Sequence, residues 1–262
     1  EVADIGRPKG IPLIIDNTAS PVICKPLAHG AAIVMHSLTK YIGGHGTSIG
    51  GIVVDGGNFD WTKNRKRQPL LNEPDQSYGG AVWIDAVPQL TGANIPFVIR
   101  LRVVLLRDTG APLAPFNAWQ IIQGLETVGL RMKQHCSNAE KVVTFLETQK
   151  KVQNVIYPTN HQGEIKERAK KYMKGGYGSL VGMDVGTKEA GAKFIDNLKM
   201  LYHVANIGDA RSLAIHPATT THSQLDDAAL AAAGVTPGYV RLSIGIEHPD
   251  DIIADIKQAL AA

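Results

Sequence analysis

Three short apolar runs near the start of the chain constrain its fold more than any other feature. They cover Leu13 to Ile15, Ala31 to Met35 and Gly51 to Val54, and each is apolar on both faces. Such strands are typical of sheets buried between helices. The connection from the first run to the second is long enough for a crossover with a short helix. The pattern therefore predicts an α/β layer, in which ligands gather at the strand ends.

The composition indicates a globular protein with a sizeable core. The chain has 262 residues, of which 44% are hydrophobic, and a formal net charge of +3. Its dense basic run, 63–67, has no interleaved aromatic residues, so we expect no nucleic-acid partner. Cys24 and Cys136 make no disulfide framework, which favours reduced thiols and a cytoplasmic location. No apolar run approaches the roughly 20 residues of a membrane span, and no signal peptide is evident, so we expect no membrane association.

The middle of the chain predicts a loop and then helices. Thr62 to Gly80 is rich in Pro, Asn, Asp and Gly, and loops of this length are often functional lids. A helix is expected around Ile99 to Leu106, ended by Pro112 and Pro115. The longest helix is predicted by apolar residues at three- and four-residue spacing, which define one buried stripe: Leu125, Val128, Met132, Cys136, Ala139, Val143 and Leu146.

Beyond Lys151 the pattern alternates between strands and helices and predicts a compact α+β module. We place a domain boundary near residue 130, which gives domains 1–130 and 131–262. The expected strands are Asn154 to Tyr157, Ser179 to Val185, Ser212 to Ile215 and Tyr239 to Ile246; the expected helices lie near Glu189 to Leu201, near Gln224 to Ala233 and from Pro249 onward.

Lys40 and Asp16 carry the clearest chemical signal. Lys40 follows an apolar strand, where partial burial disfavours a charged amine and favours a nucleophile that can form a Schiff base. Asp16 closes another apolar run, where a carboxylate can keep a pyridine nitrogen protonated. Ser37 and Thr39 supply hydroxyls that can hold a phosphate. Each residue alone also fits a solvated strand end or a capping role, but the combination predicts a pyridoxal phosphate (PLP) site.

Arg241 is a second candidate, because it is a charged residue within the apolar run Val240-Arg241-Leu242-Ser243-Ile244 and therefore needs a partner. A guanidinium can bind the α-carboxylate of an amino-acid substrate bidentately. A structural ion pair explains the same pattern, and the residues alone leave both interpretations open.

The segments Asp16-Asn17-Thr18 and Ser37-Leu38-Thr39-Lys40 resemble the Cys/Met-metabolism family of PLP-dependent enzymes. Within that family, the runs 43–51 and 212–222 are similar to the O-acetylhomoserine sulfhydrylase branch. The cystathionine enzymes typically carry an Asn-Gly-His-Ser-Asp run at the first of these places. The resemblance extends over essentially the whole chain.

The resemblance implies a type I, aspartate aminotransferase-like PLP-dependent transferase fold, with part of the large mixed-sheet cofactor domain followed by a C-terminal α+β domain. It implies a PLP Schiff base on Lys40, cofactor contacts from Asp16, Ser37 and Thr39, and substrate binding by Arg241 with Ser212 as its partner. The implied reaction in methionine and cysteine biosynthesis converts O-acetylhomoserine and sulfide to homocysteine and acetate. It further implies a homotetramer with sites shared between subunits, and an N-terminal segment of the same protein preceding Glu1.

Two alternatives stay open: a cystathionine γ-synthase or γ-lyase type of enzyme on the same cofactor, and a non-catalytic PLP-fold fragment that needs its N-terminal part. Other site classes fit the sequence poorly. The glycines of 44–50 do not match the dinucleotide-binding spacing. His29, His36 and His45 match no ordinary zinc spacing, so no metal site is expected.

Overall fold

The computed structural model describes residues 1–262, apart from the side chain at position 227, and the chain forms two compact units. Each unit is built from more than one stretch of sequence. Unit 1 comprises Glu1–Thr18, Lys25–Leu38 and Ile49–Trp119, and unit 2 comprises Ala19–Cys24, Thr39–Ser48 and Gln120–Ala262.

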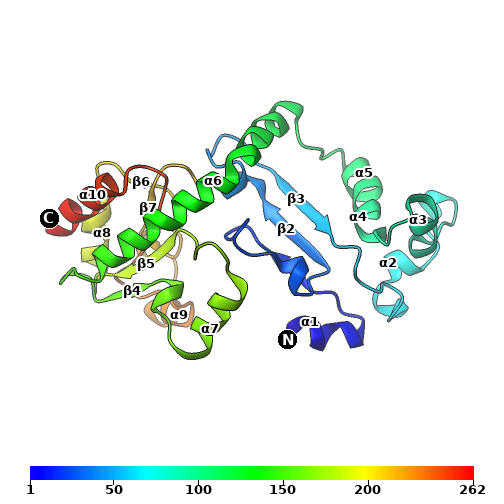
Figure 1. Ribbon diagram of the computed structural model, residues 1–262, viewed down its shortest axis with the longest axis horizontal. Helices are drawn as coiled ribbons and strands as arrows, with labels where there is room; N and C mark the ends of the chain where they lie inside the picture. The colour runs from blue at the N-terminus through cyan, green and yellow to red at the C-terminus, as the bar shows by residue number, and fades with distance from the viewer. The chain divides into compact units, whose positions relative to one another are not determined.

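Unit 1 contains a three-stranded mixed sheet in the order β1-β2-β3. Strand β1 (Ile14–Asp16) pairs in parallel with β2 (Ile33–Ser37), which pairs antiparallel with β3 (Gly51–Asp55; Figure 1). The register sets Asp16 opposite Met35. The three predicted strands are thus confirmed, with ends shifted by one or two residues.

The expected burial of these strands on both faces is wrong. Ile14, Met35 and Ile52 are 48%, 41% and 44% exposed. Ile14 and Ile52 lie in β1 and β3, the edge strands, but Met35 lies in the central strand β2. This sheet is therefore left partly uncovered, whereas sheets buried between helices are covered on both faces.

The rest of unit 1 is helical. Its α-helices are α1 (Val2–Gly6), α2 (Pro69–Asn72), α3 (Trp83–Thr91), α4 (Pro96–Arg100) and α5 (Arg107–Thr109), with a π-helical segment, Leu101–Leu106, between the last two. Short 3-10 helices cover Arg7–Lys9, Pro26–His29, Arg65–Arg67 and Gln76–Tyr78. The helix expected around Ile99 to Leu106 is confirmed, whereas α3 was not predicted.

The segment predicted as a loop, 62–80, is interrupted by α2 and by two 3-10 helices. Leu71 of α2 is 5% exposed and belongs to a core that also contains Trp61 and Trp83. The ring of Trp61 stacks on Phe97 with centroids 5.5 Å apart. A few buried apolar residues hold this otherwise polar segment to the core, so its overall composition did not predict the helices. A lid function stays a prediction.

Helix α6 (Pro115–Leu146) is the longest in the described chain, with 32 residues (Figure 1). The predicted buried stripe is confirmed from Val128 to Leu146, whose exposed fractions are 8% and 0%. Leu125 is the exception at 52% exposed. An apolar row along one helix face therefore anchors α6 in the core of unit 2.

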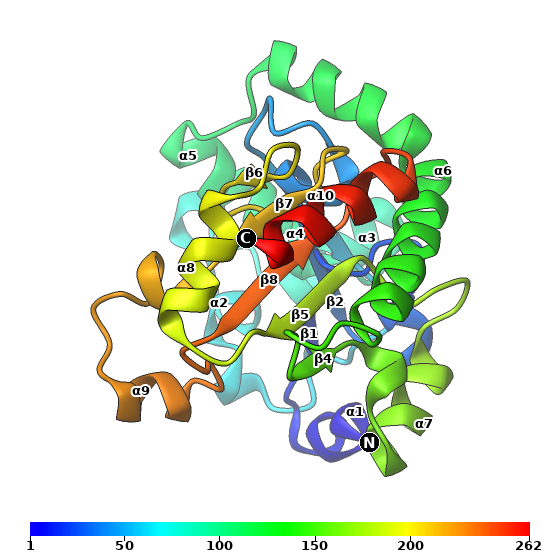
Figure 2. The same cartoon turned by 90° about the vertical axis from the view of Figure 1, so that its left-hand side faces the viewer.

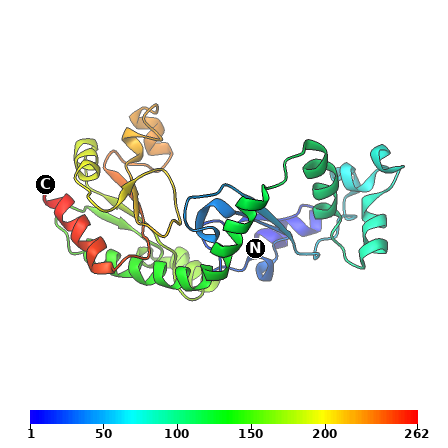
Figure 3. The ribbon, with the colours of Figure 1, turned by 90° about the horizontal axis from the view of Figure 1, so that it is seen from above.

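Unit 2 contains a five-stranded sheet in the order β4-β5-β8-β7-β6. Its strands are β4 (Asn154–Ile156), β5 (Leu180–Asp184), β6 (Tyr202–His203), β7 (Leu213–Ile215) and β8 (Tyr239–Ser243), and its later helices are α7 (Gly163–Tyr172), α8 (Lys188–Asp196), α9 (Asp227–Ala232) and α10 (Pro249–Ala261). Helix α10 lies in front of the sheet in Figure 2, and Figure 3 shows it on the same side as α6. Buried residues of α6, α8 and α10 share one core with the sheet.

The predicted α+β module is confirmed in its four strands and three helices, although α7 and the two-residue strand β6 were not predicted. Helix α8 ends at Asp196, earlier than expected, because Asn197 takes over its C-terminal cap. The domain division at residue 130 stays a prediction. Among the described residues, no single helix has the length and apolarity of a membrane span, although the pair Trp83–Thr91 and Pro96–Thr109, bent by 99°, meets those criteria together.

Candidate active site

Lys40 lies in a short π-helical turn, Leu38–Ile42, that follows β2. Its backbone angles, φ −90° and ψ −130°, lie outside the helical region, so the chain changes direction at the lysine itself. The turn is closed when the Gly44 N–H donates to the Lys40 carbonyl oxygen at 2.7 Å. The Lys40 side chain is half-buried, and its Nζ atom donates a hydrogen bond to Oδ1 of Asn206.

Arg241 approaches the same asparagine from β8. Its Nη2 atom lies 3.4 Å from the carbonyl oxygen of Asn206, within a half-buried environment. Asn206 therefore contacts both the predicted cofactor lysine and the predicted carboxylate-binding arginine. This arrangement lies wholly within unit 2.

Tyr41, directly after the lysine, is fully buried in unit 2. Its hydroxyl lies 2.7 Å from the Ser179 hydroxyl, and its ring meets the edge of His135 with centroids 5.4 Å apart. Burial raises the pKa of Tyr41, so it stays a neutral phenol. The contacts of its hydroxyl and ring thus fix the Tyr41 side chain directly after Lys40.

Asp16 and Ser37 are joined through Thr18 in unit 1. The Ser37 N–H donates to the Thr18 hydroxyl at 2.7 Å, and the Thr18 N–H donates to Asp16 Oδ1 at 2.9 Å. Hydrogen bonds from the hydroxyl and the backbone of Thr18 lower the pKa of Asp16, assisted by His36. Burial lowers the pKa of His36, against the opposing effect of Asp16. The carboxylate is therefore held in its ionised form.

Thr39 and Ser212 occupy different surroundings in unit 2. Thr39 lines a small hollow together with Gly43, Gly46 and Ser48. Ser212 is fully buried; its hydroxyl donates to Glu247 Oε2 at 2.9 Å and accepts from the Gly245 N–H at 2.8 Å. These bonds assign Ser212 a structural role, and its contact with substrate stays a prediction.

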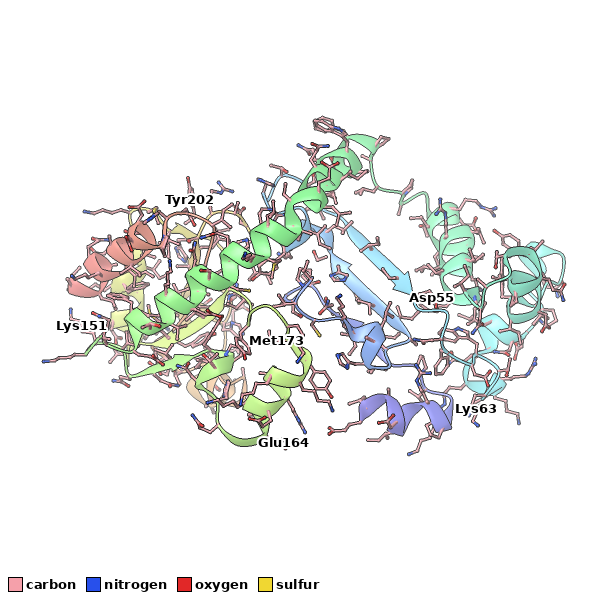
Figure 4. The ribbon with its side chains drawn as sticks, in the orientation of Figure 1. Asp55, Lys63, Lys151, Glu164, Met173 and Tyr202 are labelled. Atoms are coloured by element: carbon pink, nitrogen blue, oxygen red, sulfur yellow. The ribbon has the colours of Figure 1, made fainter. Side chains whose placement is uncertain are left out.

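A further ion pair borders this part of unit 2. Arg211 donates to both carboxylate oxygens of Asp209, each at 3.1 Å, and its guanidinium lies 4.9 Å from the ring centroid of Tyr202, labelled in Figure 4. Burial alone would raise the pKa of Asp209, but the bonds from Arg211 outweigh it and lower the pKa. Arg211 is thereby paired with Asp209, whereas Arg241 contacts the Asn206 carbonyl oxygen.

The structure thus brings the predicted residues together in two groups. Asp16 and Ser37 form one group in unit 1, and Lys40 and Arg241 form the other in unit 2. Among the described residues, no three His, Cys, Asp or Glu side chains gather as metal ligands do.

Sequence reasoning missed three residues that organise these groups. Thr18 lies in the Asp16-Asn17-Thr18 motif, and a hydroxyl two positions after an aspartate at a strand end is a signal for such a turn. Arg131 interrupts the buried face of α6, where a charge indicates a specific partner. Asn206 lies in a segment without periodicity, and no local pattern identifies it.

These features agree with the family comparison. The model of the Cys/Met metabolism PLP-dependent enzymes matches residues 1–261, and the chain belongs to this family.

Individual members of the family are also similar to this chain in sequence. The chain is 49% identical over 265 residues to an O-acetyl-L-homoserine sulfhydrylase of Leptospira meyeri, covering 99% of this chain and 60% of the relative. It is 44% identical to a homocysteine synthase of Schizosaccharomyces pombe, covering 99% of this chain and 60% of the relative. The chain therefore spans about 60% of the length of the curated relatives it matches.

A solved structure shares the fold. It is an O-acetylhomoserine (thiol)-lyase from Campylobacter jejuni that carries a pyridoxyl-lysine monophosphate. The two chains superpose with a TM-score of 0.89 at 39% identity, covering 100% of this chain and 61% of the other. The expected α/β fold of the type I PLP enzymes is confirmed.

Proposed function

We propose that this protein binds PLP and acts as an O-acetylhomoserine sulfhydrylase, forming homocysteine and acetate from O-acetylhomoserine and sulfide. The observation that carries the proposal is the double contact of Asn206 with the side chains of Lys40 and Arg241. Asn206 thus brings together a reactive amine, from Lys40, and a carboxylate-binding cation, from Arg241. This pair suits an α-amino acid substrate, which presents both an amine and a carboxylate. The names of the relatives support the specific reaction.

The residues present fit PLP. Lys40 supplies an amine for covalent attachment to the cofactor aldehyde, and Asn206 accepts a hydrogen bond from that amine. Asp16 has a lowered pKa and stays anionic, as a partner for a protonated pyridine nitrogen must. Ser37 and Thr39 would hold the phosphate through their hydroxyls.

Bound PLP would supply an electron sink for negative charge at the carbon that bears the substrate amine. Lys40, once its amine is free, is placed to take the proton from that carbon. Arg241 would hold the substrate carboxylate and so fix which Cα bond faces the lysine. The net reaction replaces the Cγ–O bond to acetate by a Cγ–S bond to sulfide.

The decisive experiment mixes the purified protein with PLP and O-acetylhomoserine, and offers either sulfide or cysteine as the nucleophile. Homocysteine from sulfide, at a rate well above that of cystathionine from cysteine, is the expected result. Preferential cystathionine formation would favour the cystathionine synthase alternative. Borohydride reduction and peptide mapping would check the attachment site, and a label on another lysine, with Lys40 unmodified, would refute the assignment.

We also propose a homotetramer and a cytoplasmic location. Exposed apolar side chains on the first half of α6 support the assembly, because apolar side chains that gather on an exposed surface mark sites that a partner covers; they are Phe116, Trp119, Ile122, Leu125 and Leu130. Light scattering coupled to size-exclusion chromatography would measure the assembly, and cell fractionation would test the location.

A further inference from the structure

The carbonyl groups directly after Lys40 are bound by a side chain and not by the backbone of a continuing helix. Arg131 of α6 donates from Nη1 to the Tyr41 carbonyl oxygen at 2.6 Å and from Nη2 to the Ile42 carbonyl oxygen at 2.9 Å. These distances are typical of strong charge-assisted hydrogen bonds. The guanidinium therefore fixes the backbone of the two residues that follow the lysine.

Arg131 is itself held rigidly on α6. Its Nη2 atom also donates to the Gly124 carbonyl oxygen at 2.7 Å, and its Nε atom donates to the Thr127 hydroxyl at 3.2 Å. The side chain is 6% exposed, burial lowers its pKa, and among the described residues no carboxylate is bonded to it. Carbonyl oxygens thus supply the negative ends that balance this buried cation.

Two glycines permit this close approach. A Cβ atom at Gly124 would lie 2.6 Å from the Ile42 carbonyl oxygen, so α6 could not approach the turn with any side chain there. Gly44 has φ +75°, and a Cβ atom at this position would lie 2.5 Å from Cζ of Arg131. Gly124 therefore leaves room for the carbonyl groups of the turn, and Gly44 leaves room for the guanidinium.

We propose that Arg131 is a positioning residue for Lys40. By binding the Tyr41 and Ile42 carbonyl groups, it sets the backbone direction at the lysine and so directs Nζ toward Asn206. The inference rests on the proposed function, because it assigns Lys40 the reactive amine. An arginine that merely stabilises the fold would affect unfolding but not the orientation of this one side chain.

The test compares Arg131→Met and Arg131→Lys with the wild-type protein. Methionine removes all four hydrogen bonds while retaining an apolar chain of similar reach, whereas lysine restores one charged donor. Arg168→Met is the matched control, since Arg168 is 54% exposed on α7. Three quantities are measured. They are the hydrogen exchange of the 41–46 amides without PLP, the rate at which Lys40 becomes labelled by PLP, as detected by borohydride reduction, and kcat and KM for O-acetylhomoserine with sulfide as the nucleophile.

For Arg131→Met we expect faster exchange in 41–46, slower labelling of Lys40 and a kcat reduced by roughly 100-fold with KM changed little, because a small misplacement of a catalytic group has this effect. Arg131→Lys should recover part of all three. A folded Arg131→Met protein with wild-type exchange and wild-type labelling would overturn the proposal. Thr127→Val removes the Nε contact of Arg131 and the 3.3 Å bond from the Thr127 hydroxyl to the Gly124 carbonyl oxygen, and leaves the bonds from Arg131 to the turn in place. It should shift the same quantities by a smaller factor and serves if Arg131→Met does not fold; unchanged exchange and labelling there would equally overturn the proposal.

Failure of the proposed function would look different. If the wild-type protein labels at Lys40 but makes no homocysteine, the sulfhydrylase assignment fails while the labelling comparison still tests Arg131. If Lys40 is not labelled in the wild-type protein, the cofactor assignment fails and with it the positioning of Lys40, although the exchange data still report whether Arg131 orders the turn.

Discussion

The Nζ atom of Lys40 donates a hydrogen bond to Oδ1 of Asn206. An amide oxygen accepts such a bond without adding a charge, so it orients the amine without forming an ion pair with it. A carboxylate at the same position would do both. The neutral partner is therefore suited to a lysine whose nitrogen must leave this bond in order to react.

Asn206→Asp should slow cofactor attachment, because a carboxylate beside Nζ replaces the neutral hydrogen bond by an ion pair that holds the amine more firmly. We expect the attachment rate to fall by roughly 10-fold, which corresponds to about 1.4 kcal/mol. The measurement is the rate of absorbance change on adding PLP. Asn154→Asp, at an exposed position on β4, adds the same charge and should leave the rate unchanged; an equal fall in both variants would contradict the local explanation.

Arg241→Ala should raise KM for O-acetylhomoserine by roughly 10- to 100-fold, since a hydrogen-bonded charge pair with the substrate carboxylate contributes about 1.5–3 kcal/mol. Labelling of Lys40 by PLP should remain. Initial-rate kinetics over a wide substrate range would measure the effect, with Arg168→Ala as a control on the exposed surface of α7. An unchanged KM would reduce Arg241 to a structural role.

Asp16→Asn should retain PLP but lose most turnover, because an amide cannot keep the pyridine nitrogen protonated. Thr18→Val removes the hydroxyl that accepts from the Ser37 N–H and whose hydrogen bond lowers the pKa of Asp16. It should give a milder loss of kcat in the same direction. Steady-state rates at saturating PLP would rank the two variants, and normal turnover in Asp16→Asn would remove the electron-sink argument.

Two glycines of α6 provide a matched pair for stability. Gly129→Ala places a Cβ atom where nothing lies within 4 Å, and should stabilise the protein by up to about 1 kcal/mol through helix propensity. Gly124→Ala places it 2.6 Å from the Ile42 carbonyl oxygen and should destabilise despite the same propensity gain. Urea unfolding measures both, and equal stabilisation by the two changes would be incompatible with close packing of the turn on α6.

The hydrogen bonds of the Asp255 carboxylate should make the free energy of unfolding depend on pH. Its carboxylate accepts hydrogen bonds from the backbone N–H groups of Lys199, Met200 and Leu201 at 2.8–2.9 Å. Burial alone would raise its pKa, but these bonds outweigh burial and lower it. An aspartate with a lowered folded-state pKa contributes stability that is complete above its unfolded pKa and is lost as pH falls through the folded value.

Asp255→Asn should therefore lower the free energy of unfolding by about 2 kcal/mol at neutral pH. The difference from the wild-type protein should be constant above about pH 6 and shrink below about pH 4, where the unfolded carboxyl becomes protonated. Urea titrations at several pH values would measure it. A difference that grows toward acid pH would contradict the assigned sign.

The sequence predicted the secondary structure of both units well where apolar periodicity was long. The stripe from Val128 to Leu146 identified α6, and the alternation after Lys151 identified the later strands. Helix α7 was not predicted, because it has no buried residue and therefore no apolar stripe. The exposure of Ile14 and Met35 could not be predicted, because local pattern does not report which faces of a sheet are covered.

The candidate site was predictable only where its residues follow strands. Asp16 and Ser37 end strands and Lys40 lies in the turn directly after β2, which local pattern reveals. Asn206 and Arg131 contact the Lys40 turn across separations of 166 and about 90 residues, which no local pattern encodes. The resemblance predicts Ser212 as a substrate contact, and this stays a prediction; its hydroxyl is bonded to Glu247 and Gly245.

The contact between Arg131 and the Tyr41 carbonyl joins residues 90 positions apart. During synthesis, the lysine turn emerges from the ribosome long before the guanidinium that binds it. At roughly 5–20 residues per second, the delay is on the order of 5–20 s. The nascent chain thus carries an unclamped Lys40 turn for seconds, and this turn can acquire its final geometry only after the middle of α6 has been made.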